Sequence, residues 1–186
     1  ITNLTGYDYH QEMFQQIAES LKGYTSRVVV SLVEAYRKAV IQFKRLEQQG
    51  IYVVRDYDRE SLERMIRALA RIARANGMEI FSCAEKMDWR PWGVQPGKCI
   101  DDRFLSAVFG IAVEGRKDPY QRPECGCIVS KDIGVYGTCL YGCRYCYAGT
   151  LNSARKKYAQ HDWRSPILYK NTEFQNENFL FEIQKR

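Results

Sequence analysis

The chain has 186 residues, of which 45% are hydrophobic and 27% are charged, and its formal net charge at pH 7 is +6. These values are ordinary for a globular protein of one domain or a large piece of one. No apolar run is long enough to span a bilayer and no signal peptide opens the chain, so we predict a cytoplasmic protein with no membrane partner. The first residue is Ile1 rather than Met, and we therefore expect a fragment or a processed product.

Predicted helices and strands alternate along the first part of the chain. Apolar residues at helical spacing predict helices, the third of which begins with Asp58 as its N-cap and ends at Gly77. Short apolar runs rich in β-branched residues predict buried strands. In chain order these elements are predicted at residues 8–22, 27–33, 36–49, 58–77, 78–83 and 101–110. Such a rhythm is typical of an α/β protein with a parallel sheet.

The predicted architecture is an α/β fold with part of a barrel. Only two strands precede the cysteine region, whereas a closed (β/α)8 barrel needs more chain. We therefore predict a partial or permuted (β/α) TIM-barrel-like body at residues 1–115, a cysteine-rich iron–sulfur region at 116–171 and a tail at 172–186. In a barrel, Cys83 at the C-terminal end of its strand would face the active site together with Glu85.

Seven cysteines against two histidines make sulfur the predominant soft ligand of this chain. The odd count and the lack of an extracellular signal favour metal-binding thiols over disulfides. Three cysteines form the motif Cys139-x-x-x-Cys143-x-x-Cys146, and four lie upstream, at Cys83, Cys99, Cys125 and Cys127. Three motif cysteines and four upstream cysteines fit one cluster with an open iron and one fully ligated cluster. They also fit a single four-cysteine site with three spare thiols, so the count leaves both arrangements open.

The three-cysteine motif has the spacing of a loop that binds a [4Fe–4S] cluster and leaves one iron open. It resembles the cluster loop of radical S-adenosylmethionine (SAM) enzymes, including the aromatic Tyr145 just before the last cysteine. In those enzymes SAM chelates the open iron, and the reduced cluster cleaves its sulfonium to start radical chemistry. Tyr145 is a candidate for stacking on the SAM adenine, while shielding of the cluster from water is the reading that we favour.

Zinc is the alternative metal. Cys143 and Cys146 could combine with Cys125 and Cys127 in a four-cysteine zinc site that leaves Cys139 idle. Two cysteines one residue apart in a loop bounded by Pro and Gly favour metal ligation, so Cys125 and Cys127 are candidate ligands in either reading. The other two upstream cysteines have a second interpretation as small buried hydrophobic residues.

The segment 144–170 is more basic than the rest of the chain. A solvated helix face is favoured over a phosphate-binding surface, because few aromatic residues are interleaved with the basic ones. The net charge is too small to argue for an anionic substrate or for nucleic acid by itself. Nucleic acid therefore stays a weak prediction as a partner.

The residues from Cys125-Gly-Cys127 to Cys146-Tyr147-Ala148 resemble an uncharacterised family, a domain of unknown function whose C-terminal cysteine cluster is itself similar to the radical SAM loop. Upstream segments 23–25, 83–85 and 99–101 resemble it as well. The resemblance covers most of the chain up to about Lys170. It implies a (β/α)-barrel-like body and iron–sulfur binding without an established activity, and it implies further sequence before Ile1.

Two departures separate this chain from ordinary radical SAM proteins. The cysteine loop follows the α/β body instead of its first strand, and no Gly-Gly-Glu-type segment follows the motif. We predict a [4Fe–4S] cluster on the motif cysteines, with the upstream cysteines as ligands of a second cluster or as spare thiols. The predicted activity is a SAM-dependent reaction on an unknown substrate, with a ferredoxin or flavodoxin as electron donor. The alternative is a non-catalytic zinc or iron–sulfur module that serves structure, electron transfer or nucleic-acid binding.

Overall fold

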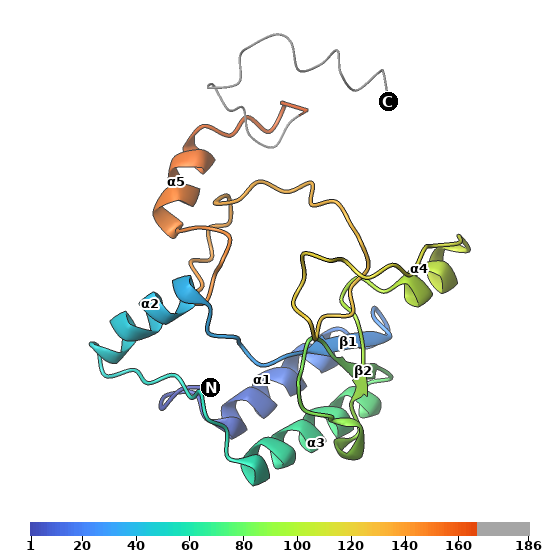
Figure 1. The fold of residues 1–186 in the computed structure, drawn as a ribbon. Coiled ribbons are helices and arrows are strands. Elements are labelled where there is room, and N and C mark those ends of the chain that lie inside the picture. The colour runs from blue at the N-terminus through green and yellow to red at the C-terminus, as the bar shows by residue number, and fades with distance from the viewer. Residues whose placement is uncertain (167–186) are drawn as a thin grey trace. The chain divides into compact units, whose positions relative to one another are not determined.

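The computed structural model describes residues 1–166, which belong to two compact units, Ile1–Lys131 and Asp132–Arg186 (Figure 1). The predicted tail at 172–186 lies outside the described residues. The first unit contains α1 (Tyr7–Ser20), β1 (Arg27–Val30), α2 (Arg37–Glu47), α3 (Arg59–Ala75), β2 (Glu79–Ser82), the short 3-10 helix η1 (Arg90–Trp92), β3 (Gln95–Pro96) and α4 (Asp102–Phe109). The second unit contains α5 (Leu151–Ala159). None of the helices in the described part has the length and apolar character needed to cross a membrane.

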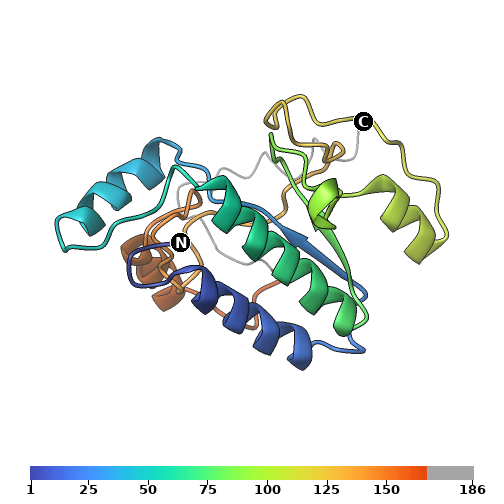
Figure 2. The same ribbon diagram turned by 90° about the horizontal axis from the view of Figure 1, so that it is seen from below.

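The sheet is parallel and its strands follow the order β1-β2-β3. Arg27 pairs with Glu79 and Val30 with Ser82 along the β1–β2 ladder, and Phe81 pairs with Gln95 between β2 and β3. α1 and α3 run side by side along the sheet (Figures 1 and 2). The carboxyl ends of β1 and β2 therefore lie together at one edge, where the chain continues into Leu32 and Cys83.

Helix α3 carries much of the core of this unit. Its N-cap is Asp58, whose carboxylate accepts a hydrogen bond from the Ser61 N–H at 2.9 Å, as the sequence predicted. Apolar side chains at helical spacing on one face of α3 are buried and pack in a cluster with residues of β2 and of the segment 89–94. The buried members from α3 are Leu62, Met65, Ile66, Leu69, Ala70 and Ala73.

The prediction of a partial or permuted TIM-barrel-like body is wrong. Residues 1–166 contain an open sheet of three strands, and no closed barrel is formed by them. Closure into a (β/α)8 barrel requires eight strands, whereas β3 here has two residues and β1 has four. β1 ends at Val30, earlier than predicted, and the Leu32 N–H donates to the Glu85 carboxylate at 2.7 Å instead of to a neighbouring strand. The correct class is a small α/β fold with an open parallel sheet.

An ion pair near the amino ends of the strands gives a test of this packing. The Arg27 guanidinium lies over the rings of Phe81 and Phe104, 4.2 and 4.9 Å from their centroids, and donates to Asp101 Oδ2 at 2.7 Å. The side chains of Arg27 and Asp101 are only 13% and 15% exposed. Burial acts to raise the pKa of Asp101, but hydrogen bonds from Arg27 and from backbone N–H groups outweigh burial and lower it.

Arg27→Met is therefore expected to lower the free energy of unfolding by roughly 2–4 kcal/mol, because it leaves a largely buried carboxylate without its cation. Urea denaturation followed by circular dichroism measures the change. Arg64→Met is the matched control, since Arg64 forms an exposed pair with Glu60 and such pairs contribute about 0.5 kcal/mol or less. Equal effects of the two substitutions would contradict the packing of Arg27.

Candidate metal centre

Three cysteine side chains from two separate parts of the sequence meet beside the carboxyl end of β2. The Sγ atoms of Cys83, Cys125 and Cys127 all lie within 4.8 Å of one another. The three residues are between 6% and 8% exposed and form a small buried cluster with Val29 and Ala84 packed against it. Three soft ligand atoms converging in a buried place form a site that could hold a metal ion.

Backbone hydrogen bonds fix Cys83 at this position. Its N–H donates to the Val30 carbonyl at 3.1 Å, which continues the β1–β2 ladder by one residue. Ala84 follows with a φ of +55°, a left-handed conformation that is uncommon for a residue with a Cβ. The chain therefore turns sharply directly after Cys83, and a residue in a sparsely populated backbone conformation marks the edge of the site.

The second pair of cysteines is held by a loop that folds back on itself. Lys117 and Ile128 form an antiparallel bridge, and the Asp118 N–H donates to the Cys127 carbonyl at 3.0 Å. The Cys125 N–H donates to the Arg122 carbonyl at 3.0 Å. The Ile128 N–H reaches the Ile100 carbonyl at 3.2 Å, which ties the loop to the segment after β3. The loop thus brings both thiols to Cys83 through ordinary backbone contacts.

The three thiols differ in acidity. Burial, followed by a hydrogen bond with the Cys99 thiol, raises the pKa of Cys83 to about 12. Burial also raises the pKa of Cys125. At Cys127 burial acts in the same direction, but hydrogen bonds led by the one from the Ile100 N–H, 3.4 Å from Sγ, lower its pKa overall. Three thiolates can share this buried place only with a cation, which would displace the protons.

Metal affinity is consequently expected to rise with pH. Cys83 and Cys125 hold their protons at neutral pH because their pKa values are raised, so binding of Zn²⁺ must release at least these two protons and tighten at least roughly 100-fold per pH unit. Competition with a chromophoric chelator at several pH values between 6 and 8 measures this slope. The same measurement on the Cys139→Ser/Cys143→Ser variant excludes the proton release that these two motif thiols would contribute on binding Zn²⁺. A slope near zero in that variant would contradict the assignment of these thiols as ligands.

The motif cysteines lie in the second unit. Cys139 and Cys143 are exposed, and Cys146 is half-buried. The Cys146 N–H donates to the Cys143 carbonyl at 3.1 Å, and Gly142, which directly precedes Cys143, has a φ of +70°. Within residues 1–166 the one group of thiol, imidazole or carboxylate ligands that meets the 4.8 Å spacing is the upstream one. The structure therefore gathers Cys83, Cys125 and Cys127 and does not gather the motif cysteines to that spacing.

The other sequence-predicted residues take individual places. Tyr145 is 55% exposed and Cys99 is exposed. Burial raises the pKa of Glu85, and the hydrogen bond from the Leu32 N–H opposes that rise. Sequence reasoning missed Ile100, whose backbone N–H donates to Cys127 Sγ. No side-chain pattern could have revealed this contact, because its donor is a main-chain N–H.

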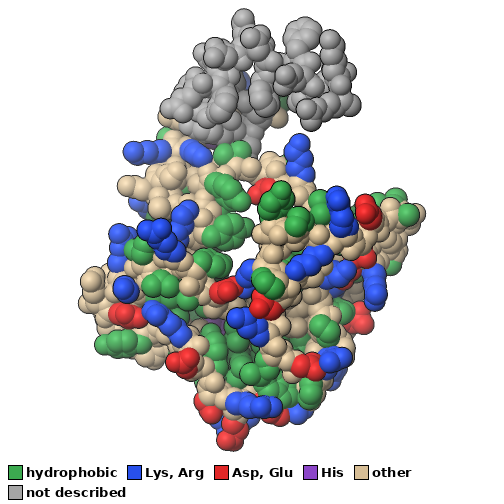
Figure 3. Space-filling view, in the orientation of Figure 1, with side chains coloured by type: hydrophobic (Ala, Val, Ile, Leu, Met, Phe, Trp, Pro, Cys, Tyr) green, Lys and Arg blue, Asp and Glu red, His purple; other side chains and the backbone are tan. Residues whose placement is uncertain are grey.

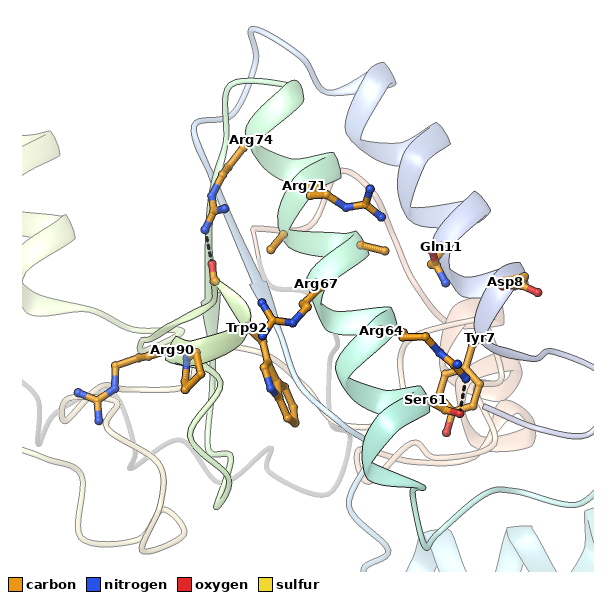
Figure 4. A pocket seen from close by; sticks show the side chains of 14 residues that line it. Tyr7, Asp8, Gln11, Ser61, Arg64, Arg67, Arg71, Arg74, Arg90 and Trp92 are labelled. Atoms are coloured by element: carbon orange, nitrogen blue, oxygen red, sulfur yellow. Dashed lines mark hydrogen bonds between the residues drawn. The ribbon is translucent and has the colours of Figure 1, made fainter.

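A second concave feature lies over α3, where four arginines line a hollow of about 900 Å³ with Arg90 (Figure 4). Glu60 and Glu63 pair with two of them, Asp88 pairs with Arg90, and Arg74 donates to the Gly93 carbonyl at 2.8 Å. Basic and acidic side chains are likewise interspersed over the face shown in Figure 3. These acidic partners offset the positive charge, so the hollow favours a solvated helix face over an anion site. The four arginines are Arg64, Arg67, Arg71 and Arg74.

Residues 1–131 therefore define an α/β protein with a buried three-cysteine site that could hold a metal ion. The chain belongs to a family described as a domain of unknown function, DUF1848, whose model matches residues 1–148. The match includes all seven cysteines, and it confirms the resemblance to a domain-of-unknown-function family. Comparison with curated proteins and with solved structures gave no match.

Proposed function

We propose that this protein is a thiolate metalloprotein with two metal-binding sets of cysteines. The observation that supports this most directly is the convergence of Cys83, Cys125 and Cys127. Cys83 lies 42 residues before Cys125 in the chain, yet the Sγ atoms of all three are buried within 4.8 Å of one another. Free buried cysteines elsewhere in a core pack singly as small hydrophobic residues. Three together at this spacing offer one site for a cation, which would displace the protons that burial retains on Cys83 and Cys125.

The finer part of the proposal concerns the motif loop. Cys139, Cys143 and Cys146 would hold three irons of a [4Fe–4S] cluster and leave the fourth open for SAM. Such a cluster supplies one-electron reduction of SAM and hence radical chemistry on a substrate. The donor set supports this, because it offers three soft thiols in one short loop and two of them are exposed.

The motif loop tolerates no side chain at Gly142 without strain. A Cβ at Gly142 would stand 3.3 Å from Leu151 Cδ2, and its φ of +70° disfavours any side chain. The exposed Tyr145 ring is available to a ligand at the cluster. An unknown substrate and an electron donor of the ferredoxin or flavodoxin class complete this proposal.

Metal and sulfide analysis of anaerobically purified protein tests the proposal, together with EPR spectra of the dithionite-reduced protein with and without SAM. About four irons and four sulfides per chain, with a signal that SAM shifts, would support the radical SAM function. The Cys139→Ser/Cys143→Ser/Cys146→Ser variant should lose that signal. Iron and sulfide that persist unchanged in this variant would contradict the assignment of the cluster to the motif loop.

A non-catalytic metal module is the second candidate function. The observation in its favour is that the centre with the required spacing is buried and held by backbone hydrogen bonds on every ligand. Structural zinc sites share these properties, since they are closed and contribute directly to folding. Stoichiometric zinc without iron or sulfide in the anaerobic protein would favour this candidate over the enzyme.

A further inference from the structure

We propose that the buried centre of residues 1–131 holds a single metal ion, and that Cys99 is its exposed and exchangeable fourth ligand. The inference rests on the proposed function, because it assumes that Cys83, Cys125 and Cys127 bind metal. It adds the nuclearity of the centre, the complete ligand set and the position at which the centre opens.

The spacing of the sulfur atoms favours one ion over a cluster. Around a single tetrahedral ion with metal–sulfur bonds of about 2.3 Å, ligand sulfurs stand roughly 3.8 Å apart. All three buried Sγ atoms lie within 4.8 Å of one another, a range that includes this value. In a cubane cluster each cysteine binds its own iron, so two irons separate any two cysteine sulfurs and the sulfurs stand farther apart. A cubane would therefore require the three buried side chains to spread.

The surrounding backbone resists such spreading. Cys83 is held by the β1–β2 ladder, and Cys125 by the Arg122 carbonyl. Cys127 accepts a hydrogen bond from the Ile100 N–H, and its own carbonyl accepts one from the Asp118 N–H. N–H groups that donate to ligand sulfurs orient the ligands and favour the thiolate form. The same contacts that would stabilise a one-ion thiolate centre thus fix its size.

Cys99 is the residue placed to complete the coordination. The backbone N–H of the next residue, Ile100, donates to Cys127 Sγ at 3.4 Å, and interaction with the Cys99 thiol is among the causes that raise the pKa of Cys83. β3 brings Cys99 there, because the Gly97 N–H donates to the Ser82 carbonyl at 2.8 Å and keeps the outgoing chain beside the end of β2. Cys99 is not a member of the 4.8 Å group. A change of its χ1 rotamer moves Sγ without moving this backbone.

The exposure of Cys99 distinguishes it from the other three ligands. They are buried, whereas Cys99 is exposed. A tetrahedral site with three fixed buried thiolates and one accessible thiolate opens at the accessible one, because only that ligand can leave toward solvent. Cys99 therefore marks the coordination position that a small exogenous ligand would take, as in zinc sites with three protein ligands and an open fourth position.

Reconstitution with Co²⁺ tests the inference in the full chain. The starting protein carries Cys139→Ser, Cys143→Ser and Cys146→Ser. Its remaining thiols are the four upstream ones that form the proposed ligand set. We expect one Co²⁺ per chain with the visible absorption of a tetrahedral thiolate site. Adding Cys99→Ser should keep one Co²⁺, remove about one quarter of the thiolate-to-cobalt charge-transfer intensity and weaken binding at least about tenfold, since one of four sulfur ligands is lost.

The outcomes separate this inference from the proposed function. An unchanged cobalt spectrum and affinity in the Cys99→Ser protein would overturn the role of Cys99 while metal binding stands. Several irons with inorganic sulfide in the starting protein after iron–sulfur reconstitution would overturn the single ion. Absence of any bound metal, in protein whose circular dichroism is that of the unsubstituted chain, would also overturn the upstream cysteines as a metal-binding set of the proposed function. Adding Cys125→Ser in place of Cys99→Ser should weaken Co²⁺ binding much more, by at least roughly 100-fold.

Discussion

Cys125→Ser is expected to weaken Zn²⁺ or Fe²⁺ binding at the buried centre by roughly 100- to 1000-fold. Apparent binding free energies of structural zinc sites are about 10–16 kcal/mol, shared among four ligands, and 1.4 kcal/mol corresponds to a factor of ten. Cys125 is only 6% exposed and its backbone is held by Arg122, so no neighbouring side chain can replace its sulfur without rearrangement. Chelator competition and metal analysis of the purified variant measure the loss.

Cys139→Ser is the matched control for this substitution. It removes a thiol from the same chain, but Cys139 is exposed and belongs to the second unit. Its effect on the metal that residues 1–131 bind should stay within about twofold, since it leaves Cys83, Cys125 and Cys127 in place. If both substitutions weakened binding alike, the buried group of Cys83, Cys125 and Cys127 would not be the centre.

Sequence reasoning predicted the first-unit helices α1–α4 and β1 and β2 to within a few residues, because each carries a strong periodic or apolar signal. It missed η1 and β3, and for α5 it gave only a solvated helix face within the segment 144–170, without bounds. Gln95–Pro96 is too short to show a strand pattern, and it pairs with β2 only because the preceding turn returns the chain to the sheet. The barrel prediction failed for a related reason. Parallel strands pair with partners that are distant in the chain, and local patterns do not count those partners.

The candidate centre shows the same limit. The spacing of Cys125 and Cys127 marked them as ligands from the sequence, whereas Cys83 had an equally good interpretation as a core residue. Two main-chain contacts without a sequence signature bring the loop to it: Ile128 N–H to Ile100, and Gly97 N–H to Ser82, the residue before Cys83. The motif around Cys139 has the stronger sequence pattern, yet the structure gathers the upstream thiols. Local spacing in the sequence therefore identified cysteines that are suited to bind metal. Which of these cysteines lie close together is determined by the fold.

Ile66→Ala is expected to lower the free energy of unfolding by roughly 3–4 kcal/mol, because it removes a side chain that is 1% exposed from the centre of the α3 face. Urea denaturation of metal-free protein measures the change. Ile41→Ala, on an exposed position of α2, should cost less than about 1 kcal/mol. A cost at Ile66 as small as that at Ile41 would show that α3 does not pack on the sheet in solution.

The Ile66→Ala protein also offers a test of the coupling between core and metal centre. The core in which Ile66 is buried includes Ile80 of β2, the strand that ends beside Cys83. Metal that binds only the folded chain should restore about 2.7 kcal/mol when Zn²⁺ is present at 100 times its dissociation constant. The Ile66→Ala/Cys125→Ser protein should show no such recovery. Equal recovery in both proteins would mean that the stabilising ion binds elsewhere, whereas recovery confined to the protein with Cys125 would tie the stability of the α/β unit to its buried thiols.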